Sequence, residues 1–176
     1  VVTLAAAPYD KSPVAYYDVI TIAGSDKRIG YLVYTSFDKE YDATLLDTLR
    51  ELAAEGVDSF ILDLRVNGGG NVESAVKLCS ALLGTEYVDA TLCELRRNPR
   101  NKSGLGNTLC TLEDVGLNLD IDEVTVICSE YTASASELVV SGLRGLDIPV
   151  TLIGSTTEGK NCGMDVTRRT IEGTYL

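Results

Sequence analysis

Hydrophobic and polar positions change their spacing several times along the chain. Residues 16–22 and 29–35 are rich in β-branched residues and flank a polar turn, which predicts a β-hairpin. Three short apolar runs lack polar alternation, as strands buried on both faces do: residues 60–64, 124–128 and 150–153. We expect another strand at residues 86–95 and an exposed loop at residues 96–107.

Three further segments show the spacing of amphipathic helices. In residues 42–55, leucines recur at helical intervals, and Gly56 is expected to end the helix. Residues 72–83 repeat this pattern and end at Gly84, and residues 135–145 form the third segment. Helices that alternate with strands predict an α/β fold with an at least partly parallel sheet.

The two ends of the chain differ from its middle. Residues 1–14 are expected to be the remnant of a preceding domain and its linker, with a short strand at residues 1–4. Residues 15–176 have a length that suits one domain, and residues 164–175 predict one more strand or hairpin. No apolar run reaches the ~18 residues that a membrane helix needs.

Charge and composition exclude several classes of function. The formal net charge is -11, and the basic residues are scattered apart from Arg96-Arg97, so nucleic-acid binding is not expected. The chain contains no histidine. This removes Ser-His-Asp and Cys-His mechanisms and most zinc sites, and leaves acid–base chemistry to carboxylates, lysine, tyrosine or the backbone. We expect neither a metal nor another cofactor.

The five cysteines include no CxxC pair, so they do not indicate a structural metal. Because five is odd, at least one thiol is free unless it pairs with another chain. Cys128 ends an apolar run and fits a small core residue. Cys93 and Cys110 flank a polar segment and are candidates for a bridge, which the sequence leaves open together with the redox compartment.

A glycine-rich segment, Asp-Leu-Arg-Val-Asn-Gly-Gly-Gly at residues 63–70, ends one predicted strand and precedes a helix. Its structural interpretation is a tight turn. Its functional interpretation is half of an oxyanion hole, with the Gly69 N–H as a donor. The segment fits neither GxGxxG nor a Walker loop.

A second segment, Thr-Ala-Ser-Ala-Ser-Glu-Leu at residues 132–138, lies between a strand and a helix. Ser134 and Glu137 have the spacing of a capping box, and capping alone explains the pattern in structural terms. The same geometry suits a nucleophile. It places the Ser134 hydroxyl at the positive end of a helix, beside an Ala135 N–H that is free to hold a developing oxyanion.

The third segment is the turn Gly-Ser-Thr-Thr-Glu-Gly at residues 154–159, which leads into Lys160. A lysine in a loop is ordinarily a solvated surface charge. Of the six lysines, however, only Lys160 sits beside a turn that leaves a predicted buried strand. Burial there would favour the neutral amine that a general base requires.

In this order and spacing, the three segments resemble the carboxyl-terminal processing (tail-specific) serine peptidase family. That family shows Asp-Leu-Arg-x-Asn-x-Gly-Gly, then Ser-Ala-Ser-Glu, then Gly-x-x-Thr-x-Gly-Lys. Each motif is modest alone, but the ordered set is specific, and the resemblance runs from about Ile29 to Gly163. Gly-Tyr-Leu-Val-Tyr at residues 30–34 and Gly-Lys-Asn at residues 159–161 are most similar to the Bacteroidetes-type branch.

This resemblance implies a crotonase/ClpP-like ββα spiral, with residues 15–176 as a catalytic domain that is incomplete at its C-terminus. It implies a Ser-Lys dyad with these positions: nucleophile Ser134, general base Lys160, oxyanion-hole donors Gly69 and Ala135, and supporting residues Asn67, Gly68 and Met164. Protein or peptide tails would be the substrates. Many members have an adjacent PDZ domain, which would lie outside this chain. The implied location is the bacterial cell envelope, as a periplasmic or lipoprotein-anchored enzyme.

The chain departs from the family pattern in three ways. Lys160 lies one position further from Ser134 than is common, so we expect one extra residue around residues 145–149. Met164 stands where better-known members carry a glutamine that orients the lysine, and Gly68 replaces a proline. A loosely oriented base would be slow.

Two other classes of function remain open. One is a catalytically weak or inactive binding module, since retinoid-binding proteins of the eye share this fold; Met164 favours it, whereas intact Ser134 and Lys160 oppose it. The other is a crotonase-type acyl-transfer enzyme, which also uses a backbone oxyanion hole. That alternative leaves the Ser-Ala-Ser-Glu and Gly-Lys matches unexplained.

Overall fold

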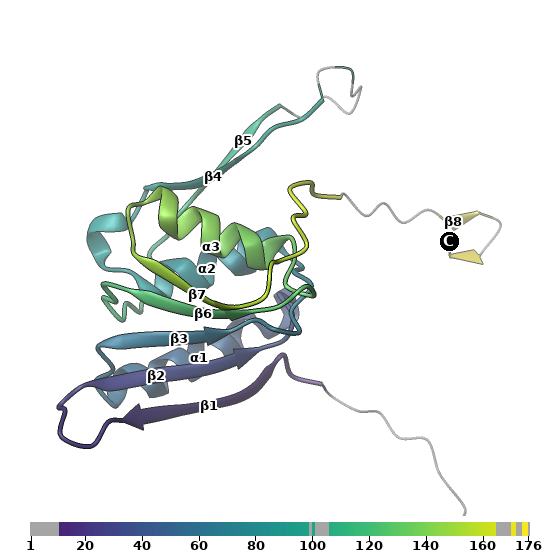
Figure 1. Ribbon diagram of the computed structural model, residues 1–176. Helices are drawn as coiled ribbons and strands as arrows, with labels where there is room; N and C mark the ends of the chain where they lie inside the picture. The colour runs from purple at the N-terminus through teal and green to yellow at the C-terminus, as the bar shows by residue number, and fades with distance from the viewer. Residues whose placement is uncertain (1–10, 99, 101–105, 165–169, 172–173, 176) are drawn as a thin grey trace, which may run out of the picture.

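The structure, a computed structural model, describes residues 11–98, 100, 106–164, 170–171 and 174–175. Its centre is a five-stranded sheet with the order β1-β2-β3-β6-β7 (Figure 1). These strands are β1 (Val14–Thr21), β2 (Arg28–Tyr34), β3 (Ser59–Asp63), β6 (Val124–Cys128) and β7 (Val150–Gly154). β1 and β2 form the predicted antiparallel hairpin, and β2, β3, β6 and β7 run parallel to one another. The predicted α/β class is therefore confirmed.

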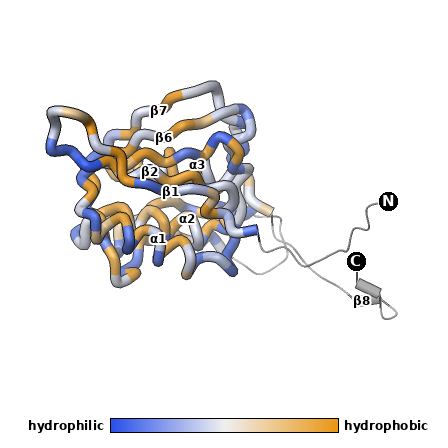
Figure 2. The backbone as a smooth tube through the Cα atoms, turned by 90° about the horizontal axis from the view of Figure 1, so that it is seen from below, coloured by the Kyte–Doolittle hydropathy of each residue, from blue (hydrophilic) through white to orange (hydrophobic). Residues whose placement is uncertain are grey.

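Three α-helices connect the parallel strands: α1 (Asp42–Ala54), α2 (Val72–Leu82) and α3 (Ala135–Gly145). The parallel strands are added in one direction across the sheet, and right-handed crossovers then place their helices on one face. Figure 2 shows α1 and α2 on the same side of the strands. Short 3-10 turns, η1 (Lys39–Tyr41) and η2 (Thr85–Tyr87), precede α1 and follow α2.

The core lies between this helical layer and the sheet. Leu32, Leu62 and Val126 are neighbours in register on adjacent strands, and each is fully buried. On the other face of these strands, Tyr31, Ile61 and Ile127 are only half-buried, whereas Asp63 is buried. Burying a leucine of this kind stabilises the fold by about 1.5–3 kcal/mol relative to leaving it exposed.

The expectation that residues 150–153 form a buried strand is wrong. β7 is the last strand of the sheet, and Leu152 and Ile153 are 39% and 54% exposed. An apolar run identifies a strand, but it does not reveal whether a neighbouring element covers that strand.

A two-stranded arm extends from the body beside α2 and α3 (Figure 1). It consists of β4 (Thr91–Leu95) and β5 (Thr108–Thr111), paired antiparallel. The strand expected at residues 86–95 thus begins only at Thr91, after η2, and β5 was not predicted. Among the described residues of the intervening segment, none belongs to a strand or helix, as expected of a loop.

The last elements are a short antiparallel pair, β8 (Thr170–Ile171) and β9 (Thr174–Tyr175), which confirms the predicted hairpin in this part of the chain. The strand expected at residues 1–4 lies outside the described residues. β1 begins at Val14, two residues earlier than expected. Within the described ranges, no helix is long and apolar enough to cross a membrane.

Parallel pairing brings the three motifs together. The glycine-rich segment follows β3, the serine segment follows β6 and the lysine segment follows β7. Because these strands are adjacent and parallel, their carboxyl ends meet at one edge of the sheet, where open α/β sheets bind ligands.

Candidate active site

Ser134 occupies a strained position at the start of α3. It is the N-cap residue of that helix and has φ 58° and ψ −115°, outside the regions that L-residues ordinarily adopt. A backbone in such a region costs on the order of 1–3 kcal/mol and persists only when its surroundings fix it. The serine is therefore held in place by the rest of the fold, as expected for a functional position.

Hydrogen bonds to the glycine-rich segment hold the serine segment in this conformation. Thr132 is fully buried, and its hydroxyl donates to the Leu64 carbonyl at 2.7 Å. The Ala133 N–H donates to the Asn67 carbonyl at 3.2 Å. The residues before Ser134 are thus joined to the segment that follows β3.

The structure separates the two serines of the Ser-Ala-Ser-Glu motif. Ser136 is fully buried, and its hydroxyl donates to the Asn67 carbonyl at 2.9 Å. Ser134 instead lines the cleft at the carboxyl edge of the sheet. Ser136 has a structural role, which leaves Ser134 as the motif serine that faces the cleft.

Gly69 lies directly against Ser134. Its φ is +98°, and a Cβ atom there would lie 2.7 Å from the Ser134 Cβ and 2.9 Å from the Ala135 nitrogen. Gly70 is equally restricted, since a Cβ would lie 2.1 Å from the Phe37 carbonyl oxygen. At Gly68, by contrast, a Cβ would meet nothing within 4 Å. The close approach requires the second and third of the three glycines, Gly69 and Gly70.

The Gly69 N–H is engaged by Asn67. The buried Asn67 side chain accepts from this N–H at 2.9 Å and donates to the Tyr34 carbonyl at 2.9 Å. The amide thereby links the end of β2 to the glycine-rich segment. Gly69 is next to Ser134 as expected, but its N–H points to Asn67 and is not free in this conformation. Ala135, the first residue of α3, has the position at which helical N–H groups lack intrahelical partners.

Glu137 joins the serine and lysine segments. One carboxylate oxygen accepts from the Ser134 N–H at 2.9 Å and from the Lys160 N–H at 2.8 Å. The other accepts from the Thr157 hydroxyl at 2.7 Å and from the Gly159 N–H at 2.6 Å. The residues have the arrangement of a capping box, although the Ser134 side chain closes no cap hydrogen bond to a described residue.

These four hydrogen bonds determine the charge state of Glu137. Burial by itself would raise the pKa of the carboxyl group, but the donors from Thr157, Ser134, Gly159 and Lys160 outweigh burial and lower it. Glu137 is therefore a carboxylate at neutral pH. Sequence reasoning identified only its capping role and missed that it holds both segments.

Lys160 reaches the same cleft as Ser134, but it is partly exposed. Since Lys160 is neither fully buried nor fully exposed, the expected burial of the base stays a prediction for the substrate-bound state. Among the described residues, no hydrogen bond joins its side chain to the Ser134 hydroxyl, and no carboxylate pairs with it. Met164 lines the cleft with a side chain that is 79% exposed.

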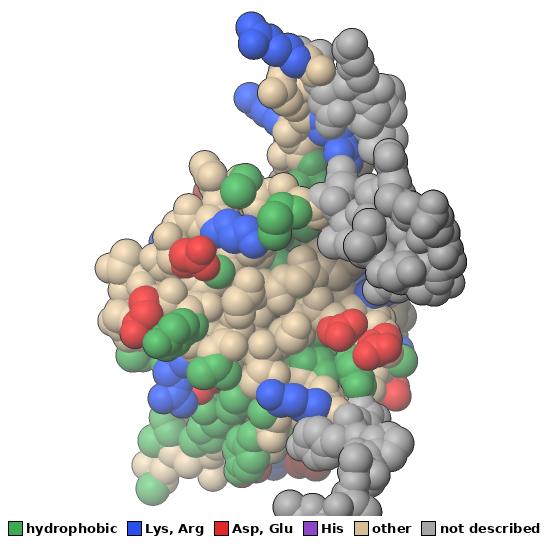
Figure 3. Space-filling model, turned by 90° about the vertical axis from the view of Figure 1, so that its right-hand side faces the viewer, with side chains coloured by type: hydrophobic (Ala, Val, Ile, Leu, Met, Phe, Trp, Pro, Cys, Tyr) green, Lys and Arg blue, Asp and Glu red, His purple; other side chains and the backbone are tan. Residues whose placement is uncertain are grey.

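The cleft has two further walls. One is the start of α2, which includes Val72, Val76 and Lys77. The other is the arm, which contributes residues 94–97 and 108–111. Figure 3 views this side of the molecule and shows Lys and Arg side chains gathered on the arm above it.

Asp63, the other carboxylate of the motifs, is bound elsewhere. It is 2% exposed and accepts from the Arg65 guanidinium at 2.6 Å and from the Tyr31 hydroxyl at 2.9 Å. Burial would raise its pKa, but the bonds from Arg65 and Tyr31 outweigh burial and lower it. Asp63 fixes the end of β3 and is not a base for Ser134.

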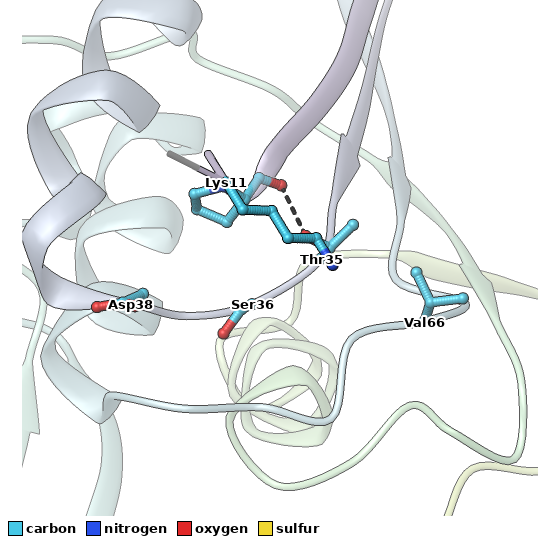
Figure 4. A pocket seen from close by; sticks show the side chains of 6 residues that line it. Lys11, Thr35, Ser36, Asp38 and Val66 are labelled. Carbon is cyan, nitrogen blue, oxygen red and sulfur yellow. Dashed lines mark hydrogen bonds between the residues drawn. The ribbon is translucent and has the colours of Figure 1, made fainter. Parts of the chain in front are cut away.

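A second, smaller hollow lies where the chain enters β1 (Figure 4). Its lining includes Lys11, Ser36 and Val66, and the Thr35 hydroxyl donates there to the Pro13 carbonyl at 3.2 Å. Among the described residues, no hydrogen bond joins the Ser36 hydroxyl to Lys11 or to Asp38, which also lines the hollow. Across the described ranges, no group of three His, Cys, Asp or Glu side chains could hold a metal ion.

Known proteins of similar sequence and structure identify the family of the chain. The sequence profile of peptidase family S41 matches residues 28–174. The chain belongs to peptidase family S41. The structure of an S41 protease from Bacteroides fragilis superposes with a TM-score of 0.78 at 29% identity, over 86% of this chain and 41% of the other. This similarity agrees with the expected Bacteroidetes-type branch.

Other S41 relatives are named for carboxyl-terminal processing. The protease of that name from Picosynechococcus is 26% identical over 76% of this chain, and CtpA of Bacillus subtilis is 27% identical over 77%. The photosystem II D1 C-terminal processing protease superposes with a TM-score of 0.64 at 25% identity, over 86% of this chain and 38% of the other. The chain spans less than a third of the length of the first two relatives, 30% and 27%.

Proposed function

We propose that this S41 chain carries the catalytic centre of a serine endopeptidase that cleaves proteins near their C-terminal tails. The observation that carries the proposal is the position of Ser134. The serine is strained, stands at a helix N-terminus and lines one cleft with Lys160. Glu137 links the backbones of both residues. With no histidine in the chain, a serine nucleophile needs another base.

In the proposed mechanism, the neutral Lys160 amine removes the Ser134 proton as the hydroxyl oxygen attacks the scissile carbonyl. The negative charge that develops on the carbonyl oxygen is held by the Ala135 N–H, and by the Gly69 N–H after this donor leaves Asn67. Removing one such donor from a serine peptidase costs about 2.7–4 kcal/mol. The protonated lysine then returns the proton to the leaving amine.

Lys160 must lose water for this mechanism. It is partly exposed in the structure, and catalytic hydrogen bonds often tighten only when substrate is bound. A peptide in the cleft would cover the amine and favour its neutral form. Asn67 and Glu137 act as positioning residues in this proposal, and among the described residues no hydrogen bond joins Gly68 or Met164 to the Lys160 amine.

A second candidate is a weak or inactive binding module with a peptidase fold. The specific observations in its favour are the partial exposure of Lys160 and the exposed Met164 where related enzymes orient the base. The intact Ser134 geometry favours the enzyme.

We further propose that residues 15–176 belong to the catalytic domain, that substrate tails arrive with the help of a neighbouring PDZ domain, and that the protein acts in the bacterial cell envelope. The names of the curated relatives support the tail preference. A superposed lipoprotein structure from Streptococcus agalactiae shares only the fold.

A fluorophosphonate probe tests the proposal, because it labels only activated serines. We expect labelling of the chain at Ser134, loss of labelling in Ser134→Ala and retention in Ser141→Ala, an exposed serine on the same helix. The binding module would be established instead if the unmodified chain, like Ser134→Ala, is not labelled and does not cleave an unfolded protein substrate.

A further inference from the structure

Cys93 and Cys110 face each other across the two strands of the arm. Cys93 lies in β4 and Cys110 in β5, and the two are direct partners in the antiparallel register. Residues paired in this way have Cα atoms about 4.5–5.5 Å apart. A disulfide accepts Cα separations of about 4.4–6.8 Å, so a cross-strand pair of this kind falls within its range. The register shifts between Thr91 and Cys93, next to the pair.

Their side chains are half-buried, and the two thiols are close enough to influence each other's ionisation. Burial, together with the interaction with Cys110, raises the pKa of the Cys93 thiol to about 12. Cys110 lines the cleft and is accessible from it. Both cysteines are reduced in the structure.

We propose that Cys93 and Cys110 are a redox modification site, which forms a disulfide by exchange with a low-molecular-weight or protein disulfide. The Cys110 thiolate attacks one sulfur of the external disulfide and releases its first thiol. The Cys93 thiolate then attacks the Cys110 sulfur and releases the second. Two protein thiols become one disulfide, one external disulfide becomes two thiols, and the two protons pass to the released thiols.

Solvent access sets the order of these steps. Cys110 meets the external disulfide first because it lines the open cleft. Cys93 has the less reactive thiol, but its position opposite Cys110 makes its attack intramolecular. Cys79 is fully buried on α2, so an external disulfide does not reach it.

The bond would fix one wall of the cleft. Residues 108–111 line the cleft that contains Ser134, and the disulfide would hold them to β4 at the base of the arm. This consequence rests on the proposed peptidase function. A wall that is already ordered lowers the entropic cost of binding a peptide. We expect the KM for a protein substrate to rise about threefold on reduction, with kcat and probe labelling unchanged.

Peptide mapping tests the bond itself and does not depend on activity. The chain is incubated with oxidised glutathione, its free thiols are blocked, and it is unfolded and cleaved after glutamate. This cleavage places Cys93 in residues 87–94 and Cys110 in residues 95–113, in separate peptides. We expect one linked product, lighter by two hydrogen atoms than the two peptides together, which disappears on treatment with dithiothreitol.

The link should be absent in Cys93→Ser and in Cys110→Ser, and present in Cys162→Ser, which removes an exposed thiol outside the arm. Glutathione retained on Cys110 without a link, or a link from Cys110 to Cys162, would overturn the proposal. Because the map needs no turnover, a chain without peptidase activity that still forms the link would refute the proposed function and leave this site intact.

Discussion

At the scale of single residues, Ser134 combines strain with a chemical task. Its positive φ is one that glycine adopts without cost, whereas any side chain adds steric strain. Ser134→Gly is therefore expected to be more stable than Ser134→Ala by about 1 kcal/mol, although both are inactive. Urea unfolding of the two variants measures the difference. Equal midpoints, or a less stable glycine variant, would show that the backbone at this position is not strained.

The role of Lys160 is tested by changing its proton chemistry. We expect Lys160→Met and Lys160→Arg to lose turnover, since methionine carries no proton acceptor and guanidinium keeps its proton at any usable pH. Activity of the unmodified chain should rise with pH, because the neutral amine is the working form. Cleavage of a peptide substrate by each variant measures this, with Lys27→Met as an exposed control. Turnover by Lys160→Arg, with Ser134→Ala inactive, would place the base elsewhere.

Glu137 links stability to pH. Its pKa is lowered in the folded state, so its contribution to stability is fully present above the ordinary glutamate pKa, near 4.5, and is lost as pH falls through the lower folded value. Glu137→Gln keeps the shape but cannot accept all four donors. We expect a loss of about 1–3 kcal/mol at pH 7 that shrinks below pH ~4.

The measurement is the free energy of unfolding of both proteins between pH 3 and pH 7, at denaturant steps fine enough to resolve ~0.5 kcal/mol. A difference that stays constant with pH would mean that the Glu137 charge is not what binds the two segments. A positioning role also predicts that kcat falls more than KM rises, since the substrate does not contact Glu137.

At the scale of elements, the glycine-rich segment owes its shape to two of its three glycines. Gly69→Ala is expected to destabilise the fold by about 1–3 kcal/mol and to abolish probe labelling, because the new methyl group would displace Ser134 or Ala135. Gly68→Ala is the matched control and should change stability by less than about 1 kcal/mol, since open space surrounds that position. Thermal unfolding and probe labelling of both variants compare them. Similar behaviour of the two would contradict the packing described for Gly69.

Elements with a clear period were predicted correctly, and the errors have physical causes. The helices and the parallel strands have apolar spacings that a single window of sequence reveals. β5 was missed because it is four residues long and follows a polar loop. The exposure of β7 depends on which elements pack against the sheet. Local sequence does not contain this information.

The features of the site also divide into those that the sequence predicts and those that depend on packing. The order of the motifs along parallel strands brought Gly69, Ser134 and Lys160 to one edge, which follows from topology alone. The Glu137 contacts to Thr157 and Gly159 and the engagement of the Gly69 N–H by Asn67 depend on side-chain geometry. Among the contacts of Glu137, only the one with Ser134 left a signal in the sequence, as the spacing of a capping box.

At the scale of the whole molecule, the arm and the body together form the cleft, and we expect a substrate tail to add a strand along β5. This strand lines the cleft and, in the part of the chain that the structure describes, pairs with β4 along only one of its two edges. A tail peptide bound to Ser134→Ala should slow hydrogen exchange at residues 108–111. Exchange at β1, on the far edge of the sheet, is the internal control and should not change. Protection confined to other strands would show that tails bind elsewhere.

The hydrogen bonds from the Ser134 and Lys160 N–H groups to Glu137 affect how the length of the sequence can vary. Since one carboxylate holds the amides of Ser134 and Lys160, the distance between these residues in space is set independently of the number of residues between them. The turn from α3 to β7, where Asp147 already has a left-handed φ of 61°, contributes none of these Glu137 hydrogen bonds. Insertions or deletions there lengthen or shorten a surface connection and leave the reacting groups in place. The extra residue in this chain would then be a neutral variation in length.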